Sequence, residues 1–235
     1  MFIVIHKALY TCAAAHRIAG LDRIHSGFES GSDNVLAFIN KGYTKAQEIE
    51  AGRKVKDSGI ELSIYYMPGA GGRALSDENA FETADVVNQI NPDFVRIRTF
   101  VAQKGTELHD DFVAGRLVEC TDKEKLLELK RMLEHIDGVD GYLYSDHIIN
   151  MLEEIYGNMG TEKARMLSVI AEFEGLELQD QREYQIARRM GMVRSLNQFF
   201  HLNAEAREIV SLQLAQHKTD ESFEAFLSML LRRYI

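Results

Sequence analysis

The sequence predicts an α/β fold in which a parallel sheet is followed by a helical C-terminal region. Helix and strand signals alternate from the start of the chain to about residue 145. This βαβ alternation implies parallel strands joined by right-handed crossovers. After Asp146 the signals are those of helices alone. No Pro-rich or Ser-rich linker separates the two parts, residues 1–145 and 146–235, so we expect them to pack as one unit.

The first elements follow from local signals. An Ala-rich helix should end at Gly20, and residues 23–28 have the composition of a strand. Ser32 and Thr44 are typical N-caps of two consecutive helices, and Thr44 with Gln47 forms a capping box. The second of these helices should end near residues 57–59, where Asp-Ser-Gly follows the last apolar position.

The later elements are placed in the same way. We expect strands over 60–67, 94–100 and 142–144, with the glycine-rich turn 68–72 between the first of these strands and the next helix. The predicted N-caps of the remaining helices are Ser76, Thr121, Thr161, Asn203 and Thr219. The predicted stops in the C-terminal part are Gly157, Gly175 and Gly191.

The strands share one polar face. With a period of two, one face is mostly apolar and the other carries Arg23, His25 and Glu29 on the first strand, Glu61, Ser63 and Tyr65 on the second, and Arg96 and Arg98 on the third. In a helix-covered parallel sheet such side chains point to a concave surface or barrel lumen that holds a polar ligand. An amphipathic antiparallel sheet with a solvated face is the alternative.

Composition narrows the classes of function. The 235 residues carry a net charge of −9, which argues against a general nucleic-acid or anionic-membrane surface and leaves small polar or anionic ligands as candidates. No apolar run is long enough to span a bilayer. Two cysteines, Cys12 and Cys120, are too few for a disulfide framework and are typical of a reducing compartment. We therefore expect a cytoplasmic protein.

Several motifs occur in an order that resembles a known family. They are GFESGSDNVLAFINKG, GIELSIYYMPGAGG, NPDFVRIRTF, SDHIINMLEEIYG and REYQIARRMG. Over about residues 18–200 the sequence closely resembles the C-terminal part of the radical S-adenosylmethionine (SAM) barrel. It is most similar to the group with oxygen-independent coproporphyrinogen oxidase, the methylthiotransferases and the Elongator catalytic subunit. The resemblance implies the later half of a TIM-like (β/α) barrel.

The resemblance also implies cofactors. In that family a [4Fe–4S] cluster binds SAM and cleaves it reductively to a radical, while the protein supplies orientation. By resemblance, Glu29 and the adjacent Ser30 lie where relatives contact SAM. Lys41 lies where relatives place a basic residue for the methionine carboxylate, here a point charge rather than the fork of an arginine. As a purely structural interpretation, Glu29 caps a helix and Lys41 is a solvated cation at a helix end.

Three further residues complete the predicted SAM site. Met67 lies in the strand-to-loop corner that the family places beside adenine. Many relatives carry an aspartate for the ribose six residues before the following proline; here that position is Leu62, and Ser63 is the substitute on the polar face. Arg98, near the end of its strand, is favoured as a ligand contact, since a guanidinium on this face needs a partner such as Glu29 or a bound carboxylate.

The cluster motif of the family, CxxxCxxC, does not occur. Cys12 and His16 have the spacing of half a metal site, but a cysteine in an alanine run is more typical of packing. We expect no metal ligands in this chain and no activity of the chain alone.

Two hypotheses follow from this departure. The first is a fragment or truncated radical SAM enzyme whose cluster is carried by a missing N-terminal half or a partner chain. The second is a non-catalytic binding module derived from the barrel. A third reading, an independent barrel enzyme with Glu29 or His25 as base, lacks a defined acid/base pair. An exposed edge along residues 23–28 also predicts self-association, pairing with such a partner chain or poor solubility. Alternatively, the apolar segment 2–19 folds over this edge. The sequence identifies neither substrate nor catalytic residues.

Overall fold

The computed structural model describes residue 17 and residues 20–234. The predicted Ala-rich helix, Cys12 and His16 lie outside these residues. The strands are β1 (Arg23–Glu29), β2 (Glu61–Tyr66), β3 (Phe94–Ile97), β4 (Tyr142–Tyr144) and β5 (Tyr156–Asn158). The helices are α2 (Asp33–Phe38), α3 (Lys45–Asp57), α4 (Ser76–Ile90), α5 (Glu107–Val113), α6 (Asp122–His135), α7 (Lys163–Glu174), α8 (Leu178–Arg189), α9 (Leu196–Phe200), α10 (Ala204–Gln216) and α11 (Asp220–Leu231), with 3-10 turns η1 (Arg73–Leu75) and η2 (Arg232–Tyr234).

The five strands form a single sheet in the order β1-β2-β3-β4-β5. The pairs β1–β2, β2–β3 and β3–β4 are parallel, and β4–β5 is antiparallel. Each parallel pair is joined through helices, as βαβ alternation predicts. The predicted fold class, a mostly parallel α/β sheet followed by a helical region, is confirmed.

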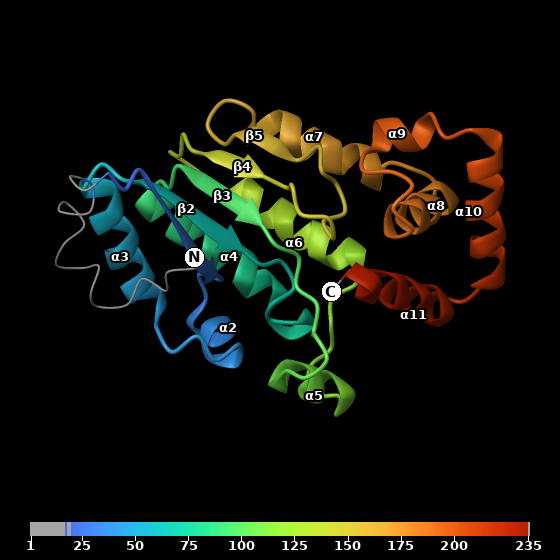
Figure 1. Cartoon of the computed structure of the whole chain (residues 1–235), viewed down its shortest axis with the longest axis horizontal. Helices are drawn as coiled ribbons and strands as arrows, with labels where there is room; N and C mark the ends of the chain where they lie inside the picture. Colours follow the sequence, from blue (N-terminus) through green and yellow to red (C-terminus); the bar gives the residue numbers. More distant parts are fainter. Residues whose placement is uncertain (1–16, 18–19, 235) are drawn as a thin grey trace.

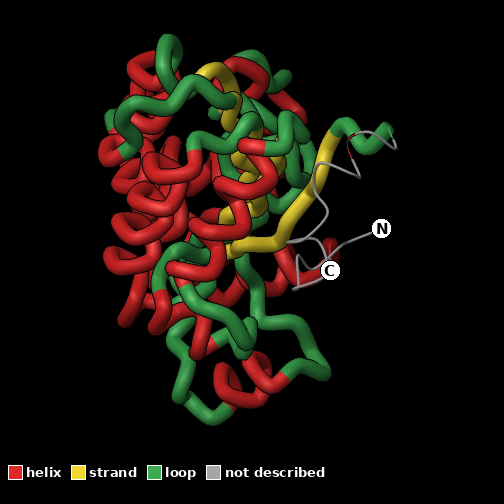
Figure 2. Tube along the Cα trace, turned by 90° about the vertical axis from the view of Figure 1, so that its left-hand side faces the viewer, coloured by secondary structure: helices red, strands yellow, loops and turns green. Residues whose placement is uncertain are grey.

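The helices of the first part lie on one face of this sheet. Figure 1 shows α3, α4 and α6 behind the strands, and Figure 2 shows the helices gathered on one side of them. Even-numbered side chains of β1 are buried toward this layer, whereas its odd-numbered ones are partly exposed. Among the described residues no helix covers the second face. The described sheet is therefore covered by helices on one face only.

The hydrophobic core of the described residues consists of one large cluster that extends along the chain and a small second one that includes Val35, Phe100 and Leu117. One cluster of buried apolar side chains runs from Ile24 on β1 through Val95 on β3 and Leu133 on α6 to Phe199 on α9 and Leu227 on α11. The sheet and the C-terminal helices therefore pack as one unit, as the absence of a linker predicted. α10 lies farthest from the sheet, at the edge of the molecule in Figure 1.

Most predicted helix caps are confirmed, because they depend on local chemistry. The side chains of Ser32, Thr44, Thr121, Asn203 and Thr219 each accept a backbone N–H of their own helix. Two caps were wrong. Ser76 is the first helical residue of α4, and its hydroxyl donates to Glu128 instead. Thr161 precedes the N-cap Glu162 and donates to Asn158.

Strand β5 corrects the expectation of helices alone after Asp146. Gly157, predicted as a helix stop, lies inside β5 with φ of 143°. On the outer side of β5, the Glu162 carboxylate accepts the Asn158 N–H at 2.9 Å, and Arg165 donates to the Tyr156 carbonyl. Side chains therefore occupy backbone groups that an additional strand would need. By contrast, β1 pairs only with β2 among the described strands.

Candidate functional site

The polar face predicted from the period of two is present at the open side of the sheet. His25, Tyr65 and Arg96 lie on it and are partly exposed, with the rings of His25 and Tyr65 stacked 6.3 Å apart. Burial, followed by the charges of Arg96 and the other arginines, lowers the pKa of His25. The imidazole is therefore neutral at neutral pH. Since the carboxyl ends of β1 to β4 meet at one edge, their following residues form a common candidate site.

The first part of this site is an ion pair between Glu29 and Lys41. Glu29, the last residue of β1, has a φ of 72°, and its Oε1 lies 3.2 Å from Lys41 Nζ. Gly27 leaves room for this pair, because a Cβ there would lie 2.6 Å from Glu29 Oε1. Both side chains are about one fifth to one quarter exposed. The structure thus brings together the two residues that sequence reasoning named separately.

Beneath the pair lies Glu48, a residue that sequence reasoning missed. It belongs to α3 and is 3% exposed, and neither carboxyl oxygen has a hydrogen-bond partner among the described residues. Burial raises the pKa of Glu48 to about 10, against the opposing charge of Lys41. The group is therefore protonated and neutral at neutral pH. Tyr43, whose hydroxyl donates to the Gly27 carbonyl at 2.7 Å, lines the same region.

The second part is a cluster of arginines at the end of β3. Arg96 and Arg98 both bind Asp146, with Arg98 Nη1 3.1 Å from Oδ1. Arg98 also lies over the Tyr65 ring, with its guanidinium carbon 4.9 Å from the centroid. Burial raises the pKa of Asp146, but the hydrogen bonds of both arginines hold it below its ordinary value. The pairing of these arginines with Glu29 was wrong; the partner is Asp146, directly after β4.

The remaining predicted residues have structural roles in this conformation. The Ser30 hydroxyl accepts the Ser32 N–H at 2.9 Å, inside the turn that begins α2. Met67 donates its N–H to the Glu29 carbonyl at 2.8 Å, so the corner after β2 is tied to the end of β1. Ser63 is fully buried, and its hydroxyl has no partner among the described residues. A ligand would reach Ser63 only after neighbouring side chains moved.

The loop carrying Glu29 and Ser30 is fixed by Gly31. Its N–H donates to the Thr83 hydroxyl at 2.8 Å, and a Cβ on Gly31 would lie 2.4 Å from the Glu82 carbonyl oxygen of α4. The obstructing atom belongs to the backbone of α4, which cannot move aside by changing a side-chain rotamer. The loop therefore approaches α4 as closely as only glycine allows.

Gly31→Ala is expected to lower the free energy of unfolding by about 2 kcal/mol or more, since loop and α4 must separate. Urea unfolding measures the change. Gly175→Ala is the control: Gly175 has a φ of −79°, and its Cβ would lie 3.2 Å from the nearest atom. If both substitutions lowered the free energy of unfolding by the same amount, the close approach of Gly31 to α4 would not be the cause of the loss.

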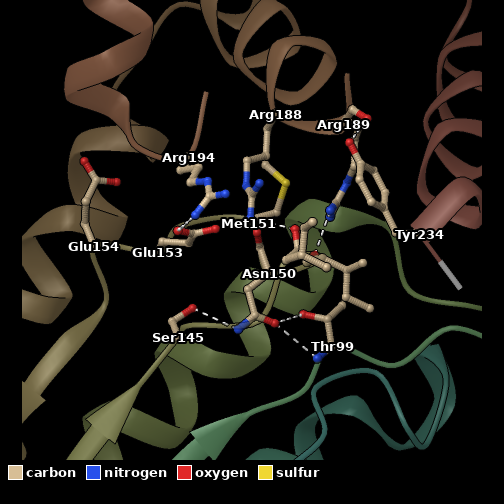
Figure 3. A network of polar contacts seen from close by, with 12 residues as sticks. Thr99, Ser145, Asn150, Met151, Glu153, Glu154, Arg188, Arg189, Arg194 and Tyr234 are labelled. Carbon is tan, nitrogen blue, oxygen red and sulfur yellow. Dashed lines mark hydrogen bonds and ion pairs between the residues drawn. The ribbon is translucent and has the colours of Figure 1, made fainter. Parts of the chain in front are cut away.

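Asn150 joins the ends of β3 and β4, as Figure 3 shows. Its Oδ1 accepts from the Thr99 hydroxyl at 2.8 Å, and its Nδ2 donates to Ser145 Oγ and the Ile97 carbonyl, each at 3.1 Å. Its own carbonyl accepts from Arg188 of α8 at 2.9 Å. The C-terminal helices thereby hold the edge at which the candidate site lies. The sequence around Asn150 contains no signal that its side-chain amide is buried and connects β3 to β4.

The described residues do not fit an iron–sulfur cluster. They contain no group of three or more His, Cys, Asp or Glu side chains able to hold a metal. Their one cysteine, Cys120, is buried, and burial with nearby Glu128 and Glu124 raises its pKa to about 12, which disfavours the thiolate that binds iron. No described helix is long and apolar enough to cross a membrane.

Comparisons with known proteins show what the chain is similar to. No family model matches the chain. It is 35% identical over 111 residues to a tRNA-2-methylthio-N(6)-dimethylallyladenosine synthase of Syntrophus aciditrophicus, covering 47% of this chain and 24% of that protein. It is 28% identical over 108 residues to a tRNA uridine(34) acetyltransferase of Methanocaldococcus jannaschii, covering 46% and 20%.

These are the methylthiotransferase and Elongator-type groups that the motifs indicated, so the predicted resemblance to these groups is confirmed. The matched segments make up about a fifth to a quarter of the two curated relatives. Among solved structures, an N-terminally shortened Elp3 of Methanocaldococcus infernus gives a TM-score of 0.49 at 19% identity, covering 70% of this chain and 39% of that one.

Proposed function

We propose that this chain provides the SAM-contacting part of a radical SAM enzyme, with the Glu29–Lys41 pair as the subsite for the methionine end of SAM. The observation that carries the proposal is the pair itself, held partly exposed at the carboxyl end of β1. A zwitterionic amino acid presents one ammonium and one carboxylate. Each side chain of the pair can exchange its partner for the opposite charge of such a ligand, so no charge is left unpaired.

The other proposed contacts lie along the same edge. Met67 follows β2 and is hydrogen-bonded to the backbone of Glu29, so it lies beside the pair. Arg98, already bound to Asp146 and Tyr65, has its charge satisfied without a ligand. We infer that Arg98 orients Tyr65 and contributes positive potential, and that its direct contact with a ligand is weaker than that of Lys41.

Cluster chemistry is not assigned to the described residues, because they do not fit the cluster. When bound to such a cluster, SAM supplies a radical that removes hydrogen from a substrate. We propose that the cluster ligands reside on an N-terminal half or on a partner chain. Among the described strands β1 pairs only with β2, and this supports the proposal, since a parallel sheet grows by adding strands at an open edge. Self-association through that edge is the corresponding expectation for the chain by itself.

The test is calorimetric titration of the chain with SAM and with 5′-methylthioadenosine, which lacks the amino acid end. Lys41→Ala should weaken SAM binding by about tenfold or more, the size of one lost charge-assisted hydrogen bond, and leave methylthioadenosine binding unchanged. The control is Lys130→Ala, because Lys130 on α6 pairs with Glu174 among the helices.

The outcomes separate the hypotheses. SAM binding that is equally strong in Lys41→Ala would remove Lys41 from the site. Absence of binding by both ligands in the folded wild-type chain would contradict the proposal and favour the second hypothesis, a non-catalytic interaction module.

A further inference from the structure

Lys125 is a buried cation that lacks a partner among the described residues. It lies in the first turn of α6 and is 6% exposed, and no hydrogen bond or ion pair joins its ammonium to any residue that the structure describes. Its aliphatic stem packs against Gly69, where a Cβ would lie 3.0 Å from Lys125 Cε. A positive charge at a helix N-terminus also opposes the helix dipole. Both conditions are unfavourable unless an anion lies nearby.

The carboxylates near Lys125 are bound to other residues. Asp122 binds Arg189 through both oxygens, at 2.6 and 2.8 Å. Glu119 accepts from Arg232 at 2.8 Å and from the Ala102 N–H at 2.6 Å. The charge of Glu224 on α11 acts on the same region, but Glu224 forms no described ion pair with Lys125. Burial lowers the pKa of Lys125, while Asp122 and Glu119 oppose that shift.

Lys125 lines a cavity of about 20 Å³ at the carboxyl ends of β3 and β4. Its other polar lining residues are Thr99, Asp122, Ser145 and Asn150. The Ser145 hydroxyl accepts a hydrogen bond from Asn150, and its own proton has no acceptor among the described residues. Two uncommitted donors, the Lys125 ammonium and the Ser145 hydroxyl, therefore belong to one cavity. A volume near 20 Å³ is enough for one water-sized atom or group.

We propose that this cavity binds a small anion, either free chloride or the terminal oxygen of a carboxylate, between Lys125 and Ser145. An acceptor of this size can take hydrogen bonds from both donors and neutralise the buried ammonium. The site is separate from the Glu29–Lys41 pair and does not depend on SAM binding. Because Thr99, Ser145 and Asn150 join β3 to β4, the anion would stabilise the edge that carries Arg98 and Asp146.

The experiment is thermal unfolding of the full chain at constant ionic strength in sodium chloride, sodium formate or sodium gluconate, whose carboxylate carries a five-carbon polyol chain that a cavity of this size does not admit. We expect the melting temperature in 0.3 M chloride or formate to exceed that in gluconate by about 3 °C, because a ligand that binds the native state raises it. A rise in chloride alone assigns a monatomic anion, and a rise in formate alone assigns a carboxylate.

Two variants identify the site. Lys125→Met should abolish the difference between anions, whereas Lys130→Met on the same helix should retain it. Ser145→Ala removes only the second donor and should reduce the difference, which keeps the test decisive if Lys125→Met does not fold. Equal melting temperatures in all three salts, or a difference that persists in Lys125→Met, would overturn the proposal.

Discussion

Replacing Arg189 by methionine is expected to lower the free energy of unfolding by about 3–5 kcal/mol, the cost of leaving a buried charge without its partner. Arg189 on α8 and Asp122 on α6 are 2% and 5% exposed, and the guanidinium binds both carboxylate oxygens. It also donates to the Ile149 carbonyl at 2.7 Å. The Arg189–Asp122 pair therefore connects α8, in the C-terminal helical region, to the first turn of α6 beside the sheet.

Urea unfolding at pH 7 measures this loss, with Arg194→Met as the control. Arg194 is 68% exposed, and its ion pair with Glu153 spans 3.9 Å, so its removal should cost less than about 1 kcal/mol. A loss below about 1 kcal/mol for Arg189→Met would show that Asp122 finds another cation, for which Lys125 in the same helix turn is the candidate. In that case, adding Asp122→Asn to the Arg189→Met variant would not restore any of the free energy of unfolding.

Replacing Glu48 by glutamine should make the protein more stable, and increasingly so as the pH rises. Burial raises the pKa of Glu48 to about 10 in the folded chain, whereas in the unfolded chain it is about 4.3. Between these values the unfolded state loses a proton that the folded state keeps. The wild type therefore loses stability relative to Glu48→Gln by up to about 1.4 kcal/mol per pH unit above pH 4.3.

The measurement is the free energy of unfolding of both proteins from pH 5 to pH 9. The control is Glu50→Gln on the same helix, because Glu50 is 62% exposed and paired with Lys54, so its pH profile should follow that of the wild type. The charged and titratable groups around Glu48 are Lys41, Glu29, Asp33 and Tyr43. Parallel profiles for wild type and Glu48→Gln would mean that Glu48 ionises in the folded state through Lys41.

Sequence reasoning succeeded where the cause is local. The capping boxes at Thr44 and Thr121 involve residues three positions apart, so their chemistry is visible in the sequence. The polar sheet face followed from a period of two. Sequence reasoning failed at β5. This strand has three residues with a glycine at the centre, which carry almost no strand signal, and it forms because it pairs with β4.

The candidate site was predictable only in part, for a related reason. Glu29 and Lys41 lie near each other in the sequence, and their roles followed from a motif. Asp146 meets Arg96 only because β3 and β4 are neighbours in the sheet. Glu48 occupies a helix position where a carboxylate normally faces water, and its burial depends on how α3 packs against β2 and α4. Contacts between distant segments are set by packing, which no local pattern encodes.

The two edge strands of the sheet, β1 and β5, differ in how easily a further strand could pair with them. Glu162 and Arg165 occupy the outward backbone groups of β5, so a further strand would have to displace two charged side chains there. On β1 no charged side chain of the described residues binds the outward backbone groups, and the Tyr43 hydroxyl occupies the Gly27 carbonyl. We propose that a complementary half, whether from the same polypeptide or another, would join at β1, next to Glu29. The Glu29–Lys41 pair, the proposed SAM subsite, would then lie at the seam between the two halves, and assembly itself would determine whether the site is enclosed.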